Sequence, residues 1–506
     1  DRPMNIKKVL IANRGEVAAR IIRTLKEMGI ASVAVFSEPD RHSLHVRMAD
    51  EAVGLEGTTS RETYLDVEKI LTAARKTKAQ AIHPGYGFLS ENPEFAERLE
   101  EEEIVFIGPK PEAIRKMGHK TTARQLMTEA GVPVIPGTIE PVRTVEEVQR
   151  LAEKIGYPLL IKAKAGGGGK GMRIAEGMND LASAFRSAAS EALQAFGDGD
   201  VYLEKLVSKP RHIEIQVIAD TFGNTFHLLE RECSMQRRHQ KVIEETPSVV
   251  LDDTMRERMG EMAVRAAKAV GYEGAGTIEC LVDENRNFYF LEMNTRLQVE
   301  HPITEAILGI DLVRMQVAIA RGERLSLDQH NIKGKGHAIE CRIYAEDPDN
   351  GFLPSPGLIR SFRVPGGPFV RLDSGVFEGA KVPIYYDPII AKLIVWDETR
   401  PLAIKRMVRA LGELKIRGIR SNVSFLLDVI QSKAFQAGDY DTRFLDTHWP
   451  ELKEESEKEL PPEDVILATA ATVRFRQEEI QRGLGQRRAA GAQASFWRYT
   501  PWKALR

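Results

Sequence analysis

Short apolar runs alternate with longer amphipathic segments over the first 118 residues of the chain. The apolar runs, which predict strands, are KKVLIANRG (7–15), IASVAVF (30–36), AIHPGYG (81–87) and EEIVFIGP (102–109). Between the first two lies a segment whose apolar side chains fall at helical spacing, namely Val17, Ile21, Leu25 and Met28. Strands that alternate with helices build parallel sheets covered on both faces. Residues 1–118 therefore predict an α/β domain with a doubly wound, Rossmann-like sheet.

The pattern changes after this domain. Residues 119–206 combine a helix-like segment with strand-like runs on either side of a glycine-rich stretch, at TVEEVQRLAEKIG (144–156), YPLLIKA (157–163) and VYLEKLV (201–207). Their size predicts a small α+β lid between larger domains. From 207 to 450 strand-like runs dominate, among them HIEIQVIAD (212–220), HAIECRIYAED (337–347) and YDPIIAKLIVWD (386–397). We expect a C-terminal, antiparallel-rich α+β domain there.

Composition limits the function classes. The chain has 506 residues, 42% hydrophobic and 28% charged, which is enough for two or three domains with sizeable cores. Its formal net charge of -2 provides no basic field for nucleic acid, so local groups must hold any bound anion. No apolar run approaches the ~20 residues of a membrane span. The cysteines, Cys233, Cys280 and Cys341, form no C-x-x-C pair, which indicates a reduced, cytoplasmic protein.

The last segment, 451–506, differs in character from the rest. It is acidic up to residue 464, with Pro461 and Pro462, and turns basic from Arg474, where FWRYTPW adds aromatic side chains. A solvated extension that packs on its own domain is one interpretation. The charge reversal and the aromatic residues favour a second, docking of a partner protein, and that is our prediction.

Two apolar runs predict a hairpin that carries carboxylates. GTIECLVD (276–283) and NFYFLEMN (287–294) flank a turn at Asn285 and Arg286. The antiparallel register then places Glu279 opposite Glu292, and Asn294 lies two residues further along the same face. Two adjacent buried carboxylates repel and require a cation, and an all-oxygen set suits Mg²⁺ (or Mn²⁺) with room for phosphates. The alternative is a solvent-facing polar side of the strand.

The stretch EMNTRLQVEHP (292–302) continues this polar face. Read as a strand, it alternates, with Glu292, Asn294, Arg296, Gln298 and Glu300 on one side. Arg296 and Gln298 would lie about 7 to 14 Å beyond the metal ligands, from the rise per residue of a strand. A guanidinium and an amide suit a small planar anion, and Glu300 could take its proton. We therefore predict metal ligands, an anion clamp and a base in one row.

A glycine-rich run predicts where phosphates are covered. KAKAGGGGKGMR (162–173) places consecutive glycines between strand-like segments, beside Lys162, Lys164 and Lys170. Gly171 stands where a Walker A loop needs Ser or Thr, so this is not that motif. A flexible linker is the alternative to a mobile hairpin over the phosphates.

Further donors gather at two places. His212, Glu214 and Gln216 alternate on one strand face. The second group is CSMQRRHQK, which contains Gln236, Arg237, Arg238, His239 and Lys241. Near a metal, such donors would clamp a transferring phosphoryl group. A surface-exposed basic loop is the alternative interpretation.

Together these motifs resemble a known family. From about residue 7 to 450 the chain resembles biotin carboxylase, the ATP-grasp component of biotin-dependent carboxylases. The matching runs are IANRGEVAARI, AIHPGYGFLSEN, FIGP, KAKAGGGGKGMR, PRHIEIQV, ERECSMQRRHQKVIEE, GTIECLVD, EMNTRLQVEHPITE and ECRIYAEDP. A glycine-rich lid and a Glu/Glu/Asn metal triad are general to ATP-grasp enzymes, whereas SMQRRHQK and EMNTRLQVEHP are specific to the biotin-dependent carboxylases.

The resemblance implies roles for individual residues. The implied ATP-binding residues are Lys120, Lys162, Gly167, Gly168, Gly169, Glu204, Lys205, Leu206, His212, Gln236, His239 and Leu281. Magnesium would be held by Glu279, Glu292 and Asn294. Bicarbonate would lie against Lys241, Arg296, Gln298 and Val299, with Glu300 as the base, and Arg342 would stabilise the enolate-like charge on biotin. The family's usual MGDK reads Met117-Gly118-His119-Lys120 in this chain, which changes the local salt-bridge pattern.

The implied activity is the first half-reaction of a biotin-dependent carboxylase, in which ATP and bicarbonate carboxylate biotin through carboxyphosphate. No A-M-K-M biotin-attachment motif occurs in the sequence, so we expect biotin to arrive on a separate carrier protein and a carboxyltransferase subunit to complete the transfer. The family further implies a homodimer. Two alternatives stay open, another bicarbonate-using ATP-grasp ligase of the carbamoyl-phosphate type and a non-catalytic nucleotide-binding subunit.

Overall fold

The computed structural model describes residues 4–138, 140–163, 172–196, 199–449, 467 and 469–477. The chain divides into two units, with the boundary between Trp449 and Pro450. Within the second unit, residues 469–477 are helical and exposed; the rest of the predicted docking segment lies outside the described residues. Among the residues described, no helix is both long and apolar enough to cross a membrane.

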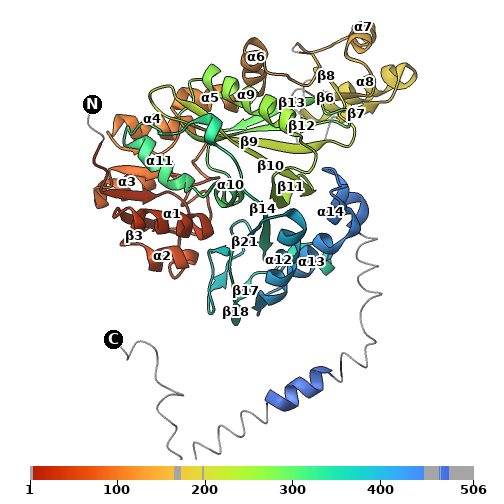
Figure 1. The fold of residues 1–506 in the computed structure, drawn as a ribbon. Coiled ribbons are helices and arrows are strands. Elements are labelled where there is room, and N and C mark those ends of the chain that lie inside the picture. The colour runs from red at the N-terminus through yellow and green to blue at the C-terminus, as the bar shows by residue number, and fades with distance from the viewer. Residues whose placement is uncertain are drawn as a thin grey trace, which may run out of the picture. The chain divides into compact units, whose positions relative to one another are not determined.

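The N-terminal part, red to orange in Figure 1, contains a parallel sheet. Its strand order is β3-β2-β1-β4-β5. Its strands are β1 (Lys8–Ile11), β2 (Ala31–Phe36), β3 (Glu51–Gly54), β4 (Ala81–His83) and β5 (Val105–Phe106). Its helices are α1 (Gly15–Glu27), α2 (Leu44–Met48), α3 (Val67–Thr77) and α4 (Pro93–Glu101), with the short helix η1 (Glu38–Asp40). Val9 and Ile11 of β1 enter one hydrophobic cluster and Leu10 enters another, so the sheet is buried on both faces. The predicted doubly wound sheet is confirmed.

A small three-stranded antiparallel sheet forms the lid, with the order β7-β6-β8. Its elements are α7 (Val145–Ile155), β6 (Leu159–Ala163), β7 (Met172–Ala175), α8 (Met178–Phe196) and β8 (Val201–Lys205). Two helices precede it, α5 (Pro111–Gly118) and α6 (Lys120–Glu129). Val148, Leu159 and Ile161 belong to a separate hydrophobic core inside the lid. The glycine-rich connection between β6 and β7, including Gly167, Gly168 and Gly169, lies outside the described residues.

An eight-stranded antiparallel sheet forms the centre of the molecule, with the order β13-β12-β9-β10-β11-β14-β21-β19. Its strands are β9 (Arg211–Ala219), β10 (Thr225–Arg237), β11 (Gln240–Thr246), β12 (Gly274–Val282), β13 (Phe288–Asn294), β14 (His337–Tyr344), β19 (Val370–Ser374) and β21 (Ile389–Asp397). The helices of this part are α9 (Asp253–Ala269), α10 (His301–Leu308), α11 (Leu312–Ala320), α12 (Arg400–Glu413), α13 (Val423–Gln431) and α14 (Lys433–Ala437). Met255, Met259 and Met262 of α9 pack on Ile213 and Ile215 of β9, which fixes the strand that carries the site residues.

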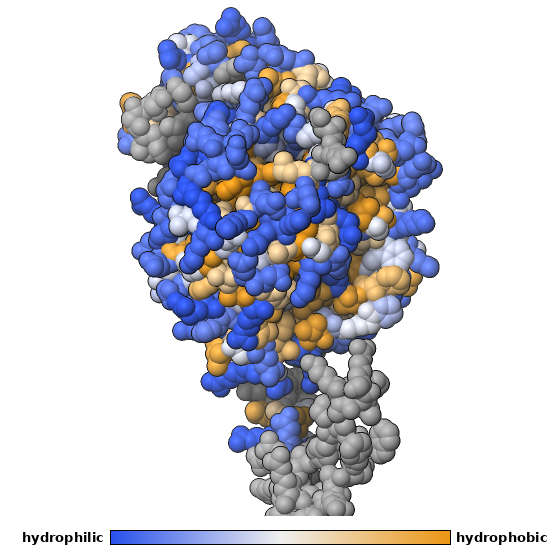
Figure 2. Space-filling view, turned by 90° about the vertical axis from the view of Figure 1, so that its left-hand side faces the viewer, coloured by the Kyte–Doolittle hydropathy of each residue, from blue (hydrophilic) through white to orange (hydrophobic). Residues whose placement is uncertain are grey.

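Short elements complete the unit. They are β15 (Glu346–Asp347) with β16 (Leu353–Pro354), β17 (Gly357–Leu358) with β20 (Lys381–Val382), β18 (Ser361–Arg363) with β22 (Lys415–Arg417), η2 (Gln329–Asn331) and η3 (Pro348–Asn350). The face in Figure 2 shows apolar side chains interspersed among hydrophilic ones, as the composition predicts for a globular chain. The combination of parallel sheet, lid and large antiparallel sheet is the predicted α/β, ATP-grasp architecture.

The predicted continuation of β13 as far as Glu300 is wrong. The strand ends at Asn294, and a loop of residues 295–300 leads directly into α10. Glu91 of the N-terminal part accepts the Thr295 N–H at 3.1 Å, a donor that a continuing strand would use for its ladder. Leu297 is buried in the core beneath the N-terminal sheet, and Pro302 lies in the first turn of α10. Tertiary contacts thus end the strand despite its alternating pattern.

Candidate active site

The β12–β13 hairpin has the predicted register. Glu279 pairs with Glu292 and Thr277 with Asn294. A bulge between Glu279 and Cys280 shifts the pairing by one residue nearer the turn, so that Cys280 pairs with Phe290. The bulge leaves the facing carboxylates in place, so the predicted register is confirmed. The prediction that both carboxylates are buried is wrong, because Glu279 is buried but Glu292 is exposed at the cavity.

These side chains open into a cavity of about 600 Å³. The predicted site residues that line it are His212, Gln236, His239, Lys241, Glu279, Leu281, Glu292, Asn294, Arg296, Gln298, Val299, Glu300 and Arg342. The other lining residues are Pro210, Gln240, Leu291, Tyr344, Asp387 and Thr442. One cavity therefore contains every residue of the central sheet, and of the loop before α10, to which the family resemblance gives a role.

The remaining described ATP-binding candidates belong to the lid and its approach, and they do not line this cavity. Lys162 of β6 forms an ion pair with Glu204 of β8. Burial, followed by the charges of Lys120 and Arg124, lowers the pKa of Lys162 to about 8. The Leu206 N–H donates to the Pro158 carbonyl at 2.9 Å, and Lys205 donates to the Tyr157 carbonyl. Basic side chains thus meet at the lid, where a polyphosphate would relieve their repulsion.

Lys241 of β11 is the central cation of the cavity. Its Nζ lies 2.5 Å from Glu214, 2.7 Å from Glu279 and 2.7 Å from Glu300. Burial alone lowers the pKa of Lys241, but the attraction of the three carboxylates outweighs it and raises the pKa well above the ordinary value. The ammonium therefore stays charged, and its charge is shared among three acidic groups.

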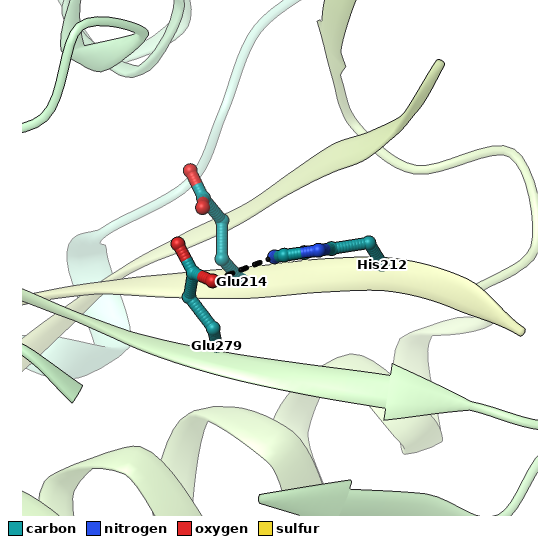
Figure 3. A group of neighbouring side chains, drawn as sticks. All are labelled: His212, Glu214 and Glu279. Carbon is teal, nitrogen blue, oxygen red and sulfur yellow. Dashed lines mark ion pairs between the residues drawn. The ribbon is translucent and has the colours of Figure 1, made fainter. Parts of the chain in front are cut away.

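Among the residues that the structure describes, two groups of side chains lie close enough together to hold a metal ion. One consists of His212, Glu214 and Glu279, and the other of Glu214, Cys233 and Glu300. Figure 3 shows His212 and Glu214 projecting from one strand and Glu279 from its neighbour, with the His212 ring directed at Glu279, 3.0 Å away. Both Glu214 oxygens already accept from cations at 2.5 Å, one from Arg231 and one from Lys241. Glu279 is engaged in the same way, since its Oε1 accepts from Lys241 at 2.7 Å.

The oxygen donors best suited to a divalent cation are those predicted from the sequence. Burial and the neighbouring Glu279 charge raise the pKa of Glu292, the effect expected where two carboxylates lie side by side. Asn294 donates from Nδ2 to Glu279 at 2.8 Å and accepts at Oδ1 from Arg296 at 2.8 Å. Two carboxylates and an amide oxygen make a hard donor set that fits Mg²⁺.

The loop 295–300 folds back toward these ligands. Gln298 Nε2 donates to Glu279 Oε1 at 2.7 Å, so the predicted separation of about 7 to 14 Å along a strand is wrong. Arg296 reaches Glu91 Oε2 at 2.8 Å. The fully buried Lys392 of β21 donates to the Val299 carbonyl at 2.6 Å and lies 3.5 Å from Glu16 of α1. The residues predicted as anion clamp and base still lie beside the predicted metal ligands, but a loop and not strand alternation brings them there.

Arg342 and Glu300 form the other wall. Arg342 of β14 donates to Glu244 at 2.5 Å and to Glu300 Oε2 at 2.9 Å. Burial raises the pKa of Glu300, yet the charges of Lys241, Arg342 and Arg231 together lower it below the ordinary value. Burial also raises the pKa of Glu244 to about 7. Glu300 is therefore ionised. It becomes a better proton acceptor when a ligand draws Lys241 or Arg342 away from it.

Sequence reasoning misplaced two arginines and missed three other residues. Arg237 pairs with Glu346 at 2.8 Å, and neither Arg237 nor Arg238 lines the cavity. Arg238 and His239 have positive φ angles of 50° and 64°, which are those of a tight hairpin turn between β10 and β11. The residues missed are Glu91, Arg231 and Asp387. The only local signal for Arg231 was a charged residue inside a long strand, and Glu91 lay unused within the AIHPGYGFLSEN run.

Comparison with family models covers most of the chain. Residues 5–114 match the "Biotin carboxylase, N-terminal domain", residues 119–328 match the "Carbamoyl-phosphate synthase L chain, ATP binding domain", and residues 340–447 match the "Biotin carboxylase C-terminal domain". The three matches follow one another along the chain.

Curated relatives agree with the family models. Biotin carboxylase 1 of Bacillus subtilis is 52% identical over 444 residues, covering 88% of this chain and 99% of the relative. A pyruvate carboxylase subunit of Methanothermobacter thermautotrophicus is 52% identical over 441 residues, covering 87% and 90%. The propionyl-CoA carboxylase alpha chain of Ruegeria pomeroyi is 48% identical over 496 residues, covering 94% and 72%.

Solved structures share the fold. The biotin carboxylase–beta-gamma-ATP complex from Campylobacter jejuni is 50% identical with a TM-score of 0.81, covering 88% of this chain and 99% of that one. The biotin carboxylase domain of Hydrogenobacter thermophilus 2-oxoglutarate carboxylase, a dimer in complex with MgADP, ADP and bicarbonate, is 48% identical with a TM-score of 0.80, covering 88% and 98%. By sequence, fold and the residues gathered in its cavity, the chain belongs to the biotin carboxylase family.

Proposed function

We propose that this protein carboxylates biotin at the expense of ATP, with bicarbonate as the carbon source. One observation carries the proposal: the ionised Glu300 lies between Lys241 and Arg342 in the cavity that also contains Glu279, Glu292 and Asn294. A base, two cations and a hard donor set in one place suit the activation of a small oxyanion by phosphoryl transfer. The structural relatives with bound ATP analogue and with MgADP and bicarbonate support this assignment.

In the first step, Glu300 takes the proton of bicarbonate as a bicarbonate oxygen attacks the γ-phosphorus of ATP and ADP leaves. Lys241, Arg296, Gln298 and the Val299 backbone would hold the anion in line. Mg²⁺, held by Glu279, Glu292 and Asn294, would supply positive charge to the phosphates. In the described structure Lys241 occupies the space between Glu279 and Glu300 and can turn toward the bound anion.

The second step forms the carbon–nitrogen bond. Carboxyphosphate breaks into CO₂ and phosphate, the phosphate takes the N1 proton of biotin, and N1 attacks CO₂. Arg342 would stabilise the negative charge on the ureido oxygen during this attack. We assign ATP contacts to Lys120, Lys162, Glu204, Lys205, Leu206, His212, Gln236, His239 and Leu281, with the glycines of 167–169 covering the phosphates.

We further propose that biotin is presented on a separate carrier protein and that a carboxyltransferase subunit consumes the carboxybiotin. The high coverage of Biotin carboxylase 1 and of the pyruvate carboxylase subunit supports a multi-subunit arrangement. A homodimer is supported by the dimeric structural relative. Within the chain we assign residues 1–118 to the N-terminal domain, 119–206 to the linker and lid, 207–450 to the C-terminal domain and 451–506 to the extension.

The test is ADP release with ATP, Mg²⁺ and bicarbonate, measured with and without free biotin. Biotin should stimulate a bicarbonate-dependent rate, and labelled bicarbonate should appear in carboxybiotin. The ATP-binding family match leaves a carbamoyl-phosphate-type ligase as the second candidate. Equal rates with and without biotin would refute biotin carboxylation and favour that candidate.

A further inference from the structure

A fully buried arginine, Arg231 of β10, lies beneath the cavity without lining it. Its guanidinium nitrogens donate to five acceptors, which are Glu214 Oε1 (2.5 Å), Gln216 Oε1 (2.6 Å), Gln298 Oε1 (2.7 Å), Thr304 Oγ1 (3.0 Å) and Thr277 Oγ1 (3.3 Å). A guanidinium has five N–H donors and no acceptor. All of its donors are therefore used, and its position is fixed by four separate elements.

A side chain that has only hydrogen-bond donors determines the orientation of the amide group of a neighbouring glutamine. The side-chain amide of Gln298 presents an oxygen to one side and an NH₂ group to the other. Because Arg231 offers only donors, the oxygen must face it, and the NH₂ group must face the opposite side. There it donates to Glu279 Oε1 at 2.7 Å. A reversed amide would place NH₂ against the guanidinium and oxygen against a carboxylate, two repulsive contacts at once.

Gln216 repeats the arrangement away from the cavity. Its Oε1 accepts from Arg231, and its Nε2 donates to the carbonyls of Gly276 (2.9 Å) and Val217 (3.2 Å). The two amides differ in what their NH₂ groups meet. That of Gln216 is used up on backbone carbonyls, whereas Glu279 is the one described residue that accepts from Gln298 Nε2, which leaves its second N–H for a ligand in the cavity.

We propose that Arg231 is a positioning residue that turns Gln298 so that the cavity meets an N–H donor, and that this selects an oxyanion over a hydrogen-bond donor at the bicarbonate subsite. The inference rests on the proposed function, since it concerns how the same site recognises its anion. Arg231 touches no substrate in this scheme. It acts on the bound anion through Gln298, whereas its charge near Glu300 bears on the proton transfer and so on kcat.

A double-substitution cycle tests the role. In the wild-type background Arg231→Lys should raise the bicarbonate KM about tenfold, the cost of losing a hydrogen bond to a charged ligand, while the ATP KM changes less than about twofold. In a Gln298→Ala background the same substitution should change the bicarbonate KM less than about twofold. Thr304→Val removes another acceptor of Arg231 without contacting Gln298 and should leave the bicarbonate KM within about twofold of wild type.

Equal effects of Arg231→Lys in both backgrounds, or equal changes in the ATP and bicarbonate KM values, would overturn the inference. If Arg231→Lys does not fold, neutron diffraction from wild-type crystals in D₂O decides. Two deuterons on the Gln298 atom nearer Glu279 support the inference, and two on the atom nearer Arg231 refute it. A wild-type enzyme without bicarbonate-dependent ADP release would instead refute the proposed function.

Discussion

The Lys241 ammonium and the Glu300 carboxylate lie 2.7 Å apart, with Arg342 at 2.9 Å on the other Glu300 oxygen. These contacts have two opposing effects on the proposed role of Glu300 as a base. The two cations keep Glu300 ionised, but they also make it a weak base until a ligand takes their charge. Bicarbonate at the proposed subsite would be such a ligand, because an anion between Lys241 and Glu300 would draw the ammonium away from the carboxylate.

Glu300→Gln should abolish the proposed turnover and spare nucleotide binding. The amide keeps the shape of the side chain but cannot take a proton, so kcat should fall at least about 100-fold. ADP release measured alongside fluorescence titration with an ATP analogue checks both parts. Glu112→Gln, an exposed glutamate of α5, is the matched control. Retention of a near wild-type kcat by Glu300→Gln would show that another group takes the proton.

Glu292→Gln should weaken Mg²⁺ binding. The substitution removes one charge from the Glu279–Glu292 pair, so the Mg²⁺ concentration at half-maximal activity should rise about tenfold or more. Mn²⁺ binding followed by electron paramagnetic resonance gives a readout independent of turnover. Glu284→Gln, in the exposed turn of the same hairpin, should change neither value. An unchanged Mn²⁺ affinity in Glu292→Gln would remove Glu292 from the ligand set.

Glu245 should make stability depend on acid pH. His337 at 2.6 Å and Arg400 at 2.7 Å offset its burial and lower its pKa to about 2. The unfolded value is about 4.3, so this stabilisation is complete above about pH 4.3 and is lost as the pH falls toward 2.

At neutral pH, Glu245→Gln should therefore lower the free energy of unfolding by about 3 kcal/mol. Urea unfolding at several pH values measures the loss, and the difference from wild type should shrink in acid. Glu398→Gln, an exposed control, should follow the wild-type curve. A difference that stays constant with pH would show that the carboxylate charge is not the cause.

His119→Asp should stabilise helix α6. His119 is the N-cap of this helix but makes no capping hydrogen bond, and the first turn contains no acidic residue. An aspartate there would accept from the free N–H groups and complement the helix dipole, which is worth about 1 kcal/mol. Hydrogen exchange of the α6 amides, together with thermal unfolding of the protein, checks the gain. His119→Ala should give none, and an equal effect of both substitutions would contradict the capping argument.

Deletion of residues 455–506 should weaken binding to the carrier or carboxyltransferase partner and leave carboxylation of free biotin intact. The charge reversal and the aromatic residues of this segment motivate the prediction. Pull-down with the partner proteins and the free-biotin assay measure the two effects separately. Unchanged complex assembly after the deletion would refute a docking role.

The sequence predicted much of the site because strand alternation is a local property. The register of Glu279 with Glu292 followed from two apolar runs and a turn. The path after Asn294 could not be predicted in this way, because the Thr295 N–H is taken by Glu91, 204 positions earlier in the chain. Likewise the dense cations around Arg237 and Arg238 suggested a phosphate clamp, but Arg238 lies in a hairpin turn and Arg237 pairs with Glu346. Arg231 was missed because its five partners come from separate segments.

The loop that carries Arg296, Gln298 and Glu300 is held at its beginning by the N-terminal part of the chain, and near its end by a lysine of β21 that contacts the same part. Glu91 holds its beginning, and Lys392, next to Glu16, holds the Val299 carbonyl near its end. The parallel sheet is thus a scaffold for the catalytic pocket as well as a neighbour of it. A chimaera with a foreign N-terminal domain would therefore have to keep the contacts made by Glu91 and Glu16. Without them, the loop would lose its shape even if every residue that lines the cavity were retained.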